Sequence, residues 1–373
     1  MKSYLLFSAL ALLSLFTLQF TPKKKSAKKV VIAYVFGSRR LVNPDSVDAE
    51  KLTHINYAFV NIKDGRAILQ KPDTDAINLG RLIDLKKRNP DLKILISVGG
   101  WSWSKLFSDA ALTDSSRALF AQSAASIVQQ FNLDGIDIDW EYPGLRGDNN
   151  IFRPEDKENF TLMLQQLRAE LNKLKDSTHK QYFLTAATAG FKAFIEHTEL
   201  EKAQQYMDYY NVMTYDFKTE EAQFAGHHTN LYNSKFDPDG ESADRAVQNY
   251  ISIGVKPEKI VIGIAFYGRG WKTSGINNDG LGEKTISGVR GGGYTRLKDS
   301  IITAPGYIRY WDKKARAPYL FNQKDSIFIT YDDEKSVKQK CRYVNKQDLA
   351  GVMFWEYFGD SKGYLLDAIK KNL

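Results

Sequence analysis

The segment FNLDGIDIDWEYPG (residues 131–144) alternates acidic and bulky apolar side chains at a strict step of two. Because successive side chains of a β-strand point to opposite faces of the sheet, these two kinds of residue separate onto two faces. The two sets are Asp137, Asp139 and Glu141 on one face, and Ile136, Ile138 and Trp140 on the other. In a parallel barrel the apolar face packs against helices, so we expect the acids to point inward and toward the C-terminal mouth.

Apolar runs of strand length recur along the whole chain, and amphipathic stretches of helix length separate most of them. The runs cover residues 30–36, 53–60, 92–100, 133–140, 182–188, 209–216, 259–268 and 350–357. The intervening stretch Pro154–Lys175, for example, places apolar residues at three- and four-residue steps, as an amphipathic helix does. This alternation predicts an α/β fold, namely a (β/α)8 TIM barrel over residues 30–373. An open doubly wound sheet is the alternative, although no Gly-rich phosphate loop follows the first run.

A long Gly-rich segment with short aromatic stretches separates the seventh run from a helix expected to open near Asp333. We predict a small α+β insertion domain at residues 269–327, between strand 7 and helix 7 of the barrel. A long stabilising loop is the simpler interpretation. Because structureless loops of this length are usually functional, we favour a wall that deepens a cleft at the rim of the barrel.

Residues 1–29 have the pattern of an export signal. Lys2 precedes an apolar run from Tyr4 to Phe20, and five lysines follow between Lys23 and Lys29. No A-x-A-like triplet follows Phe20, so an uncleaved N-terminal anchor is the alternative. We therefore predict an exported protein, secreted or periplasmic, that an uncleaved anchor could retain at the membrane.

The composition argues against several other classes of protein. Six of the net +8 charges are lysines up to Lys29, which leaves only +2 for residues 30–373 and removes the charge argument for nucleic-acid binding. A single cysteine, Cys341, rules out an intramolecular disulfide, and we expect no disulfide-linked partner. Five scattered histidines do not suggest a metal site. We expect a monomer without cofactor or metal.

The acidic face has a chemical consequence of its own. Carboxylates that are buried close together repel one another, which raises the pKa of at least one of them. A carboxylic acid that keeps its proton near neutral pH can serve as a general acid. Glu141, furthest along the strand and with the longest side chain, is the expected donor. Two alternatives remain at this point: a Mg²⁺ or Ca²⁺ site on the three acids, and an edge strand with a solvated acidic face.

Four segments in the expected order resemble the glycoside hydrolase family 18 chitinases. LDGIDIDWEYPG (133–144) resembles the D-G-x-D-x-D-W-E motif, and the others resemble the S-x-G-G, M-x-Y-D and closing tryptophan strands. These other segments are ISVGGWSWS (96–104), VMTYDF (212–217) and GVMFWEY (351–357). The resemblance covers residues 29–373, and many members carry an α+β insertion domain after the strand that here ends in FYGR (266–269).

The resemblance implies a catalytic role for four residues: Glu141, Asp139, Asp137 and Tyr215. Glu141 would protonate the glycosidic oxygen while the 2-acetamido oxygen of the substrate attacks, which gives an oxazolinium intermediate and net retention. Asp139 would orient the acetamido group and stabilise its positive charge, Asp137 would tune Asp139 from below, and Tyr215 would hydrogen-bond the acetamido oxygen. The acids would titrate as a coupled set.

The resemblance also implies a set of substrate-binding residues around the acids. They are Trp355, Trp101, Asp216, Met213, Tyr142, Gly100, Tyr267 and Arg269. Trp355 would form the floor under the distorted sugar, Trp101 would lie beyond the cleavage point, and Asp216 would contact the sugar. Ser97 could hydrogen-bond Asp137. Family members also contain non-proline cis peptide bonds, here expected at Ala58–Phe59, Glu141–Tyr142 and Trp355–Glu356.

We therefore predict an exported chitinase that acts on chitin or chitooligosaccharides, cleaving β-1,4 bonds between N-acetylglucosamine units. The first alternative is an endo-β-N-acetylglucosaminidase that cuts the chitobiose core of N-glycans. The second is a non-catalytic chitin-binding lectin on the same barrel. Relatives of that kind typically lose the acid glutamate, whereas Glu141, Asp139 and Tyr215 are all present in this chain.

Overall fold

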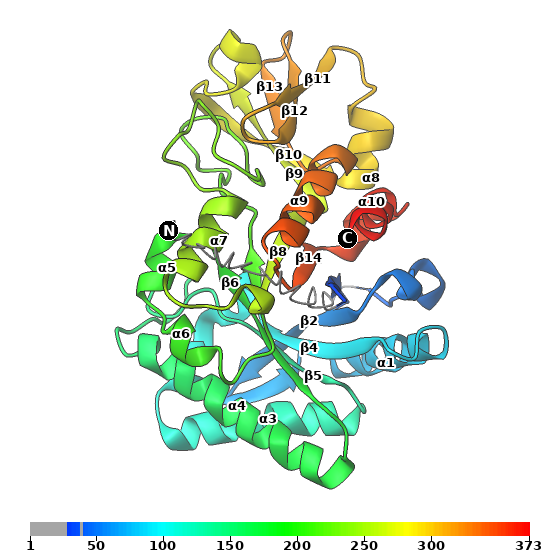
Figure 1. Cartoon of the computed structure of the whole chain (residues 1–373), viewed down its shortest axis with the longest axis vertical. Helices are drawn as coiled ribbons and strands as arrows, with labels where there is room; N and C mark the ends of the chain where they lie inside the picture. Colours follow the sequence, from blue (N-terminus) through cyan, green and yellow to red (C-terminus); the bar gives the residue numbers. More distant parts are fainter. Residues whose placement is uncertain (1–27, 38–39) are drawn as a thin grey trace, which may run out of the picture.

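A closed barrel of eight parallel strands forms the centre of the computed structural model, which describes residues 28–37 and 40–373 (Figure 1). Its strands are β1 (Val30–Phe36), β2 (His54–Lys63), β4 (Lys93–Gly99), β5 (Gly135–Asp139), β6 (Phe183–Ala189), β7 (Tyr209–Met213), β8 (Ile260–Ala265) and β14 (Gly351–Trp355). β1 pairs in parallel with both β2 and β14, so the sheet has no open end. This closure confirms the predicted (β/α)8 barrel and excludes the open sheet. The short β3 (Arg66–Leu69) adds an antiparallel strand to β2.

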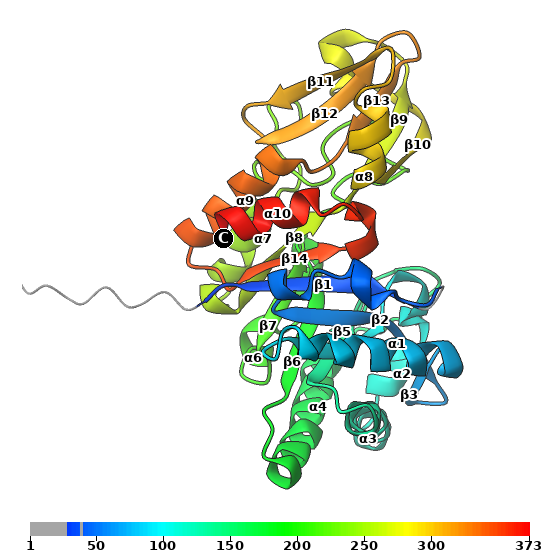
Figure 2. The ribbon, with the colours of Figure 1, turned by 90° about the vertical axis from the view of Figure 1, so that its right-hand side faces the viewer.

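Helices follow the barrel strands and cover the outside of the barrel (Figure 2). They are α1 (Pro72–Asp84), α2 (Phe107–Ala111), α3 (Asp114–Gln130), α4 (Asp156–Thr178), α5 (Lys192–Glu196), α6 (Leu200–Ala203), α7 (Ala243–Ser252), α9 (Glu334–Lys346) and α10 (Tyr364–Asn372). The stretch Pro154–Lys175, predicted to be helical, forms α4. The helix expected near Asp333 is α9, and the Asp333 side chain caps its N-terminus together with Ser336.

Short helical turns occupy several of the connections. They are η1 (Pro44–Ser46), η2 (Ala49–Lys51), η3 (Leu85–Lys87), η4 (Trp101–Leu106), η5 (Pro257–Lys259), η6 (Asn277–Gly280), α8 (Tyr294–Arg296), η7 (Leu297–Ile301) and η8 (Tyr357–Asp360). Of these, η4 follows β4 directly and lies at the mouth of the barrel, where the predicted site residue Trp101 opens the turn.

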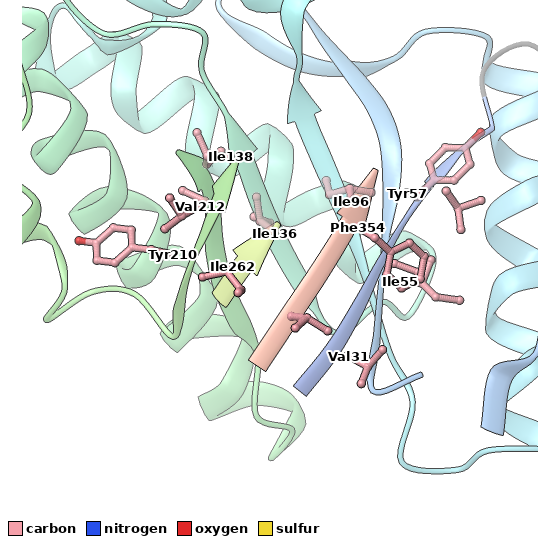
Figure 3. Close-up of a cluster of buried hydrophobic side chains, with 14 of the residues drawn as sticks. Val31, Ile55, Tyr57, Ile96, Ile136, Ile138, Tyr210, Val212, Ile262 and Phe354 are labelled. Carbon is pink, nitrogen blue, oxygen red and sulfur yellow. The ribbon is translucent and has the colours of Figure 1, made fainter. Parts of the chain in front are cut away.

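The largest apolar core lies between the barrel strands and the surrounding helices (Figure 3). The apolar face of β5 contributes Ile136, Ile138 and Trp140, all essentially inaccessible to solvent. The Trp140 ring stacks on Phe107 of α2, with ring centroids 5.3 Å apart, and meets the edge of Phe160 in α4. The period-two pattern of the sequence therefore assigned the two faces of this strand correctly.

The inside of the barrel holds a smaller apolar cluster next to a polar centre. The cluster consists of Val30, Ile32, Tyr34, Ala187, Val261 and Met353. Beside it, Asp137 and Asn211 are fully buried in the interior. Buried polar groups are stable only where they are hydrogen-bonded, so this centre depends on the contacts described below.

A second sheet, antiparallel and five-stranded, lies at one end of the molecule, above the barrel in the view of Figure 1. Its strands are β9 (Tyr267–Thr273), β10 (Thr285–Gly293), β11 (Tyr307–Asp312), β12 (Ala317–Asn322) and β13 (Ile327–Thr330). It has its own apolar cluster, built around Trp271, Phe321 and Phe328. Residues 269–327, for which the sequence predicts an insertion domain, lie within this segment.

The predicted export signal or anchor, residues 1–29, falls almost entirely on residues 1–27, which lie outside the described part of the chain. Across residues 28–37 and 40–373, the helices are all too short or too polar to span a bilayer.

Replacing Trp140 by alanine should destabilise the fold strongly, because the substitution leaves a cavity where the ring packs against Phe107 and Phe160. We expect a loss of about 3–5 kcal/mol in the free energy of unfolding, measured by denaturant titration. The matched control is Ile286→Ala on the exposed face of β10, which should change stability by less than about 0.5 kcal/mol. Equal effects of the two substitutions would contradict this description of the core.

Candidate active site

The three acids of β5 and its C-terminal extension form a row that rises through the barrel toward its mouth. Asp137 is 0% exposed, Asp139 4% and Glu141 8%, so the row becomes more accessible along the strand direction. All three side chains point away from the helix-packed face that carries Trp140. The geometry therefore matches the orientation expected from the alternating sequence, with Glu141 outermost.

Asp137, the innermost acid, accepts hydrogen bonds from four side chains on four other strands. The donors are Tyr34 (2.9 Å), Ser97 (2.7 Å), Thr185 (2.5 Å) and the Asn211 amide (3.1 Å). Burial raises the pKa of Asp137, while these four bonds oppose the increase by stabilising the carboxylate. The hydrogen bond predicted from Ser97 is present. The other three donors were not identified from the sequence, although each points inward from a predicted strand.

Asp139 and Glu141, the outer acids, interact through a side-chain hydrogen bond, which raises the pKa of Asp139 and lowers that of Glu141. Burial raises the pKa of Asp139 well above its usual range, and repulsion from Glu141 and Asp137 adds to this increase. Burial likewise raises the pKa of Glu141 to about 7. The Asp139 Oδ1 atom is buried without a hydrogen-bond partner. The outer pair therefore holds a proton near neutral pH and leaves one acceptor unused.

Ser104 organises the backbone around the outer acids, and the sequence did not reveal this role. Its hydroxyl accepts a hydrogen bond from the Glu141 N–H (2.9 Å) and lies 3.0 Å from the Asp139 carbonyl oxygen. Gly99 gives the room for this contact, because a Cβ atom there would come within 2.2 Å of the Asp139 carbonyl oxygen. Ser104 lies within the ISVGGWSWS segment, but a lone serine in a turn carries no signal for this contact.

Tyr215 lies beside the acid row, at the end of β7. Its hydroxyl contacts the Met353 sulfur at 3.7 Å, and burial followed by repulsion from Asp139 raises its pKa well above the usual value. The ring has space because the facing residue of β8 is Gly263, where a Cβ atom would lie 2.6 Å from the ring. Tyr215 is therefore a neutral hydroxyl group close to the outer acids.

Asp216, the next residue, is held by two donors from the start of the second sheet. Its Oδ1 accepts from the Tyr267 hydroxyl (2.7 Å) and from Arg269 Nε (2.6 Å), and His228 Nδ1 lies 3.4 Å away. Burial alone would raise the pKa of Asp216, but Arg269 and His228 outweigh burial and lower it. Tyr267 and Arg269, predicted to bind substrate, thus serve in this structure to hold Asp216. His228 was not predicted.

Aromatic rings surround the mouth of the barrel above the acids. Trp355 stacks on Phe59 with centroids 5.4 Å apart and an interplanar angle of 20°, and Phe36 lies 5.8 Å from it. Trp101, in η4, is 52% exposed and makes an edge contact with Tyr142, which itself hydrogen-bonds Glu141. Exposed or half-exposed ring faces near an acid pair suit the apolar faces of sugar rings.

The remaining predicted residues take supporting positions. Met213 is half-buried against the apolar cluster inside the barrel. Gly100 has a φ of +87°, and a side chain there would collide with the Phe59 ring that supports Trp355. The three cis peptide bonds predicted at Ala58–Phe59, Glu141–Tyr142 and Trp355–Glu356 are all present.

The metal alternative has no support from geometry in the described part of the chain, where His, Cys, Asp and Glu side chains nowhere form a cluster of three that could hold an ion. Asp137, the innermost member of the hypothetical site, already accepts four hydrogen bonds. Cys341 is buried, and burial raises the pKa of its thiol to about 12.

A cavity of about 300 Å³ lies away from the acids, between the β7–α7 connection and the second sheet, and is lined in part by Phe224 and Phe236.

A TIM barrel whose mouth holds a proton-sharing carboxylate pair between aromatic rings is the architecture of a glycoside hydrolase. A family model described as glycosyl hydrolases family 18 matches residues 29–360. The chain therefore belongs to glycosyl hydrolase family 18.

Curated relatives carry chitinase names. Chitinase A1 of Niallia circulans is 34% identical over 397 residues, which cover 90% of this chain and 56% of that protein. Chitinase B of Serratia marcescens is 30% identical, covering 93% of this chain and 84% of that protein. The chain thus spans little more than half of the first relative and most of the second.

Solved structures of the family share the fold. A family 18 N-acetylglucosaminidase from Paenibacillus barengoltzii superposes with a TM-score of 0.87 at 42% identity, covering 93% of this chain and all of that one. Chitinase ChiA74 from Bacillus thuringiensis gives a TM-score of 0.86 at 32% identity, covering 93% of this chain and 70% of that one.

Replacing Gly263 by alanine should disturb Tyr215, because the added methyl group would lie 2.6 Å from its ring. We expect a loss of about 1–3 kcal/mol in stability from this overpacking, measured by denaturant unfolding. Combining Gly263→Ala with Tyr215→Ala should cost less than the sum of the two single substitutions.

The matched control for this test is Gly80→Ala in helix α1, where an added Cβ meets no atom within 4 Å. Helix propensity predicts a gain of about 0.5–1 kcal/mol for that change. Additive costs at Gly263 and Tyr215 would show that the ring does not depend on the glycine.

Proposed function

We propose that this protein is an exported chitinase that hydrolyses β-1,4 bonds between N-acetylglucosamine units with retention of configuration. The observation that carries the proposal is the outer acid pair: Glu141 has a pKa raised to about 7 and is joined to Asp139, whose second oxygen is unpaired. Export rests on the sequence pattern of residues 1–29.

The proposed first step breaks the bond between C1 and the glycosidic oxygen. Glu141 gives its proton to that oxygen while the acetamido carbonyl oxygen of the substrate forms a bond to C1. The resulting oxazolinium ion is positive, and Asp139 stabilises it while Tyr215 donates to the acetamido oxygen. Water then adds to C1 from the side that the leaving group vacated, and Glu141 takes back a proton.

Two features support a sugar polymer as substrate. Trp355 and Trp101 each present an accessible aromatic ring at the mouth of the barrel, and aromatic faces of this kind suit stacking with sugar rings. The curated relatives named above are both chitinases. The alternative drawn from the sequence, cleavage of the chitobiose core of N-glycans, predicts that the protein releases glycans from a glycoprotein.

A second candidate is release of single N-acetylglucosamine units from chain ends. The observation in its favour is the 42% identity to the N-acetylglucosaminidase from Paenibacillus barengoltzii, which this chain covers completely. The two activities share the chemistry at Glu141 and differ only in where the substrate chain is cut.

Incubation with N-acetylglucosamine hexamer tests the proposal and separates the candidates. NMR should show that the first products have the β-anomeric form. Products from dimer to tetramer would indicate a chitinase, and monomer would indicate cleavage at chain ends. Glu141→Gln, which cannot donate the proton, should lower kcat by at least about 100-fold. Early α-anomers would contradict the mechanism. If neither the wild-type protein nor Glu141→Gln shows detectable turnover, the result would support a lectin. Activity should persist in EDTA, whereas its loss would restore the metal alternative.

The rate should depend on pH through Glu141, because only its protonated form donates. As pH rises through about 7, the raised pKa of this carboxyl, kcat/KM should fall. Repulsion from Asp216 contributes to that raised pKa, so Asp216→Asn should move the alkaline limb to lower pH as well as reduce the rate. Asp91→Asn on the surface is the control and should leave the limb in place. A limb that stays unchanged in Asp216→Asn would show that another group controls it.

A further inference from the structure

A buried ion pair that the proposed mechanism does not use lies behind the active site. Lys340 of α9 is 1% exposed and Asp332, just after β13, is 0% exposed, and their charged atoms are 2.6 Å apart. Burial lowers the pKa of Lys340, and Asp332 opposes this effect. Two charges removed from water in this way are costly, and a neutral apolar pair of similar size often stabilises a protein equally well.

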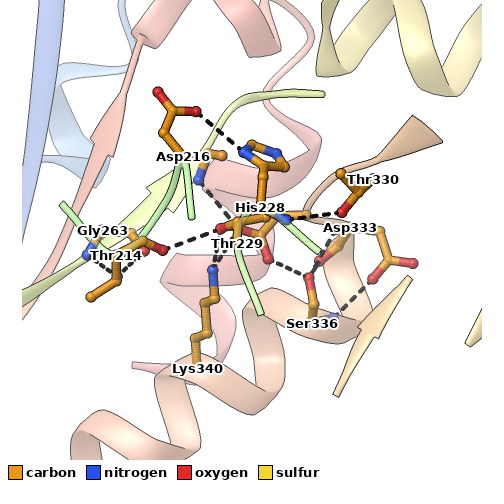
Figure 4. A network of polar contacts seen from close by, with 11 residues as sticks. Thr214, Asp216, His228, Thr229, Gly263, Thr330, Asp333, Ser336 and Lys340 are labelled. Atoms are coloured by element: carbon orange, nitrogen blue, oxygen red, sulfur yellow. Dashed lines mark hydrogen bonds and ion pairs between the residues drawn. The ribbon is translucent and has the colours of Figure 1, made fainter. Parts of the chain in front are cut away.

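The contacts of this pair show what the charges hold in place (Figure 4). Lys340 Nζ donates to the Thr229 hydroxyl (2.7 Å), and Thr229 donates to Asp332 Oδ2 (2.7 Å). The same Asp332 oxygen accepts from the backbone N–H of Ala265 (3.2 Å), and its other oxygen accepts from Ser336 (2.6 Å). The pair thus ties helix α9 to the end of β8 and to the connection between β7 and α7.

This connection leads directly to the active site. Thr229 follows His228, whose backbone carbonyl accepts from the N–H of Phe217 (3.1 Å) and whose ring lies 3.4 Å from Asp216. Asp216 has a φ of +58°, a left-handed conformation that surrounding contacts must hold in a residue other than glycine. The chain between Thr229 and Tyr215 is therefore fixed from both ends.

Two parts of the second sheet, the start of β9 and the end of β13, hold Asp216 in place. At its start, Tyr267 and Arg269 of β9 bind the Asp216 carboxylate. At its exit, Thr330 of β13 accepts from the backbone N–H of His228 (3.3 Å), and Asp332 follows two residues later. Lys340 is the positive charge that keeps the Asp332 carboxylate in place at this exit.

We propose that Lys340 is a positioning residue, which acts with Asp332 through Thr229 and His228 to hold Asp216 and Tyr215 against the acid pair. The inference rests on the proposed hydrolase function and goes beyond it, because Lys340 touches neither the acids nor the aromatic rings. A purely structural pair would affect stability alone. A positioning pair also affects turnover and the environment of His228.

The test uses the double variant Asp332→Asn/Lys340→Met, which removes both charges and leaves no unpaired ion in the interior. We expect kcat on N-acetylglucosamine hexamer to fall by about tenfold or more, because small misplacements of reacting groups are costly, with a smaller change in KM. The alkaline limb of the pH profile should also move, because Asp216 contributes to the raised pKa of Glu141.

The matched control is Asp134→Asn/Lys86→Met. Asp134 is buried at the amino end of β5, away from the mouth, and its carboxylate pairs with the partly exposed Lys86 (2.6 Å) and with Lys180 (3.0 Å). This variant should keep both kcat and the pH profile. An equal loss of kcat in the two double variants would assign the effect to general destabilisation and overturn the proposal.

A second measurement does not depend on activity. In histidine-labelled protein, the NMR signals of the His228 ring should shift in Asp332→Asn/Lys340→Met, while those of His54, in the barrel interior, should not. If the wild-type protein fails to cleave the hexamer, the proposed function fails, and a shift at His228 still supports the positioning of Asp216. Unchanged His228 signals would overturn the positioning role, whether or not the protein is active.

Discussion

The carboxylate of Asp137 is the constraint on which the barrel and its site both depend. A carboxyl group at the centre of a closed barrel is tolerated only if hydrogen bonds within the protein replace those to the water that it loses. Here the donors come from β1, β4, β6 and β7, so one side chain of β5 links five of the eight barrel strands. The polar centre thus holds the strands in register at the level from which the catalytic row rises.

The same arrangement sets the chemistry further along β5. Asp137 is occupied by four donors, whereas Asp139 and Glu141 interact with each other in a setting where burial raises both pKa values. Ser104 fixes the backbone beneath them, and the second sheet fixes Asp216 beside them. One strand therefore supplies the acids, while segments distant in the sequence influence their pKa values.

The sequence predicted most of the barrel and the orientation of the row, because both follow from a local rule. Alternation along β5 is sufficient to place Asp137, Asp139 and Glu141 on the inner face. Motif resemblance supplied the roles proposed for Tyr215 and Trp355, which no periodicity could supply. Ser104, His228 and Lys340 were missed because their roles arise from contacts between residues far apart in the sequence, and a single serine, histidine or lysine has no local pattern that indicates such a contact.

The central claim is that the outer acid pair keeps a proton at neutral pH, and carbon-13 NMR titration of the labelled Glu141 carboxyl tests it most directly. The structure predicts an apparent pKa near 7 for this group, raised by burial. In Asp139→Asn, removing the coupled acid should change that value and leave a single titration step. A Glu141 carboxyl that titrates in one step at the ordinary glutamate value in the wild-type protein would contradict the account.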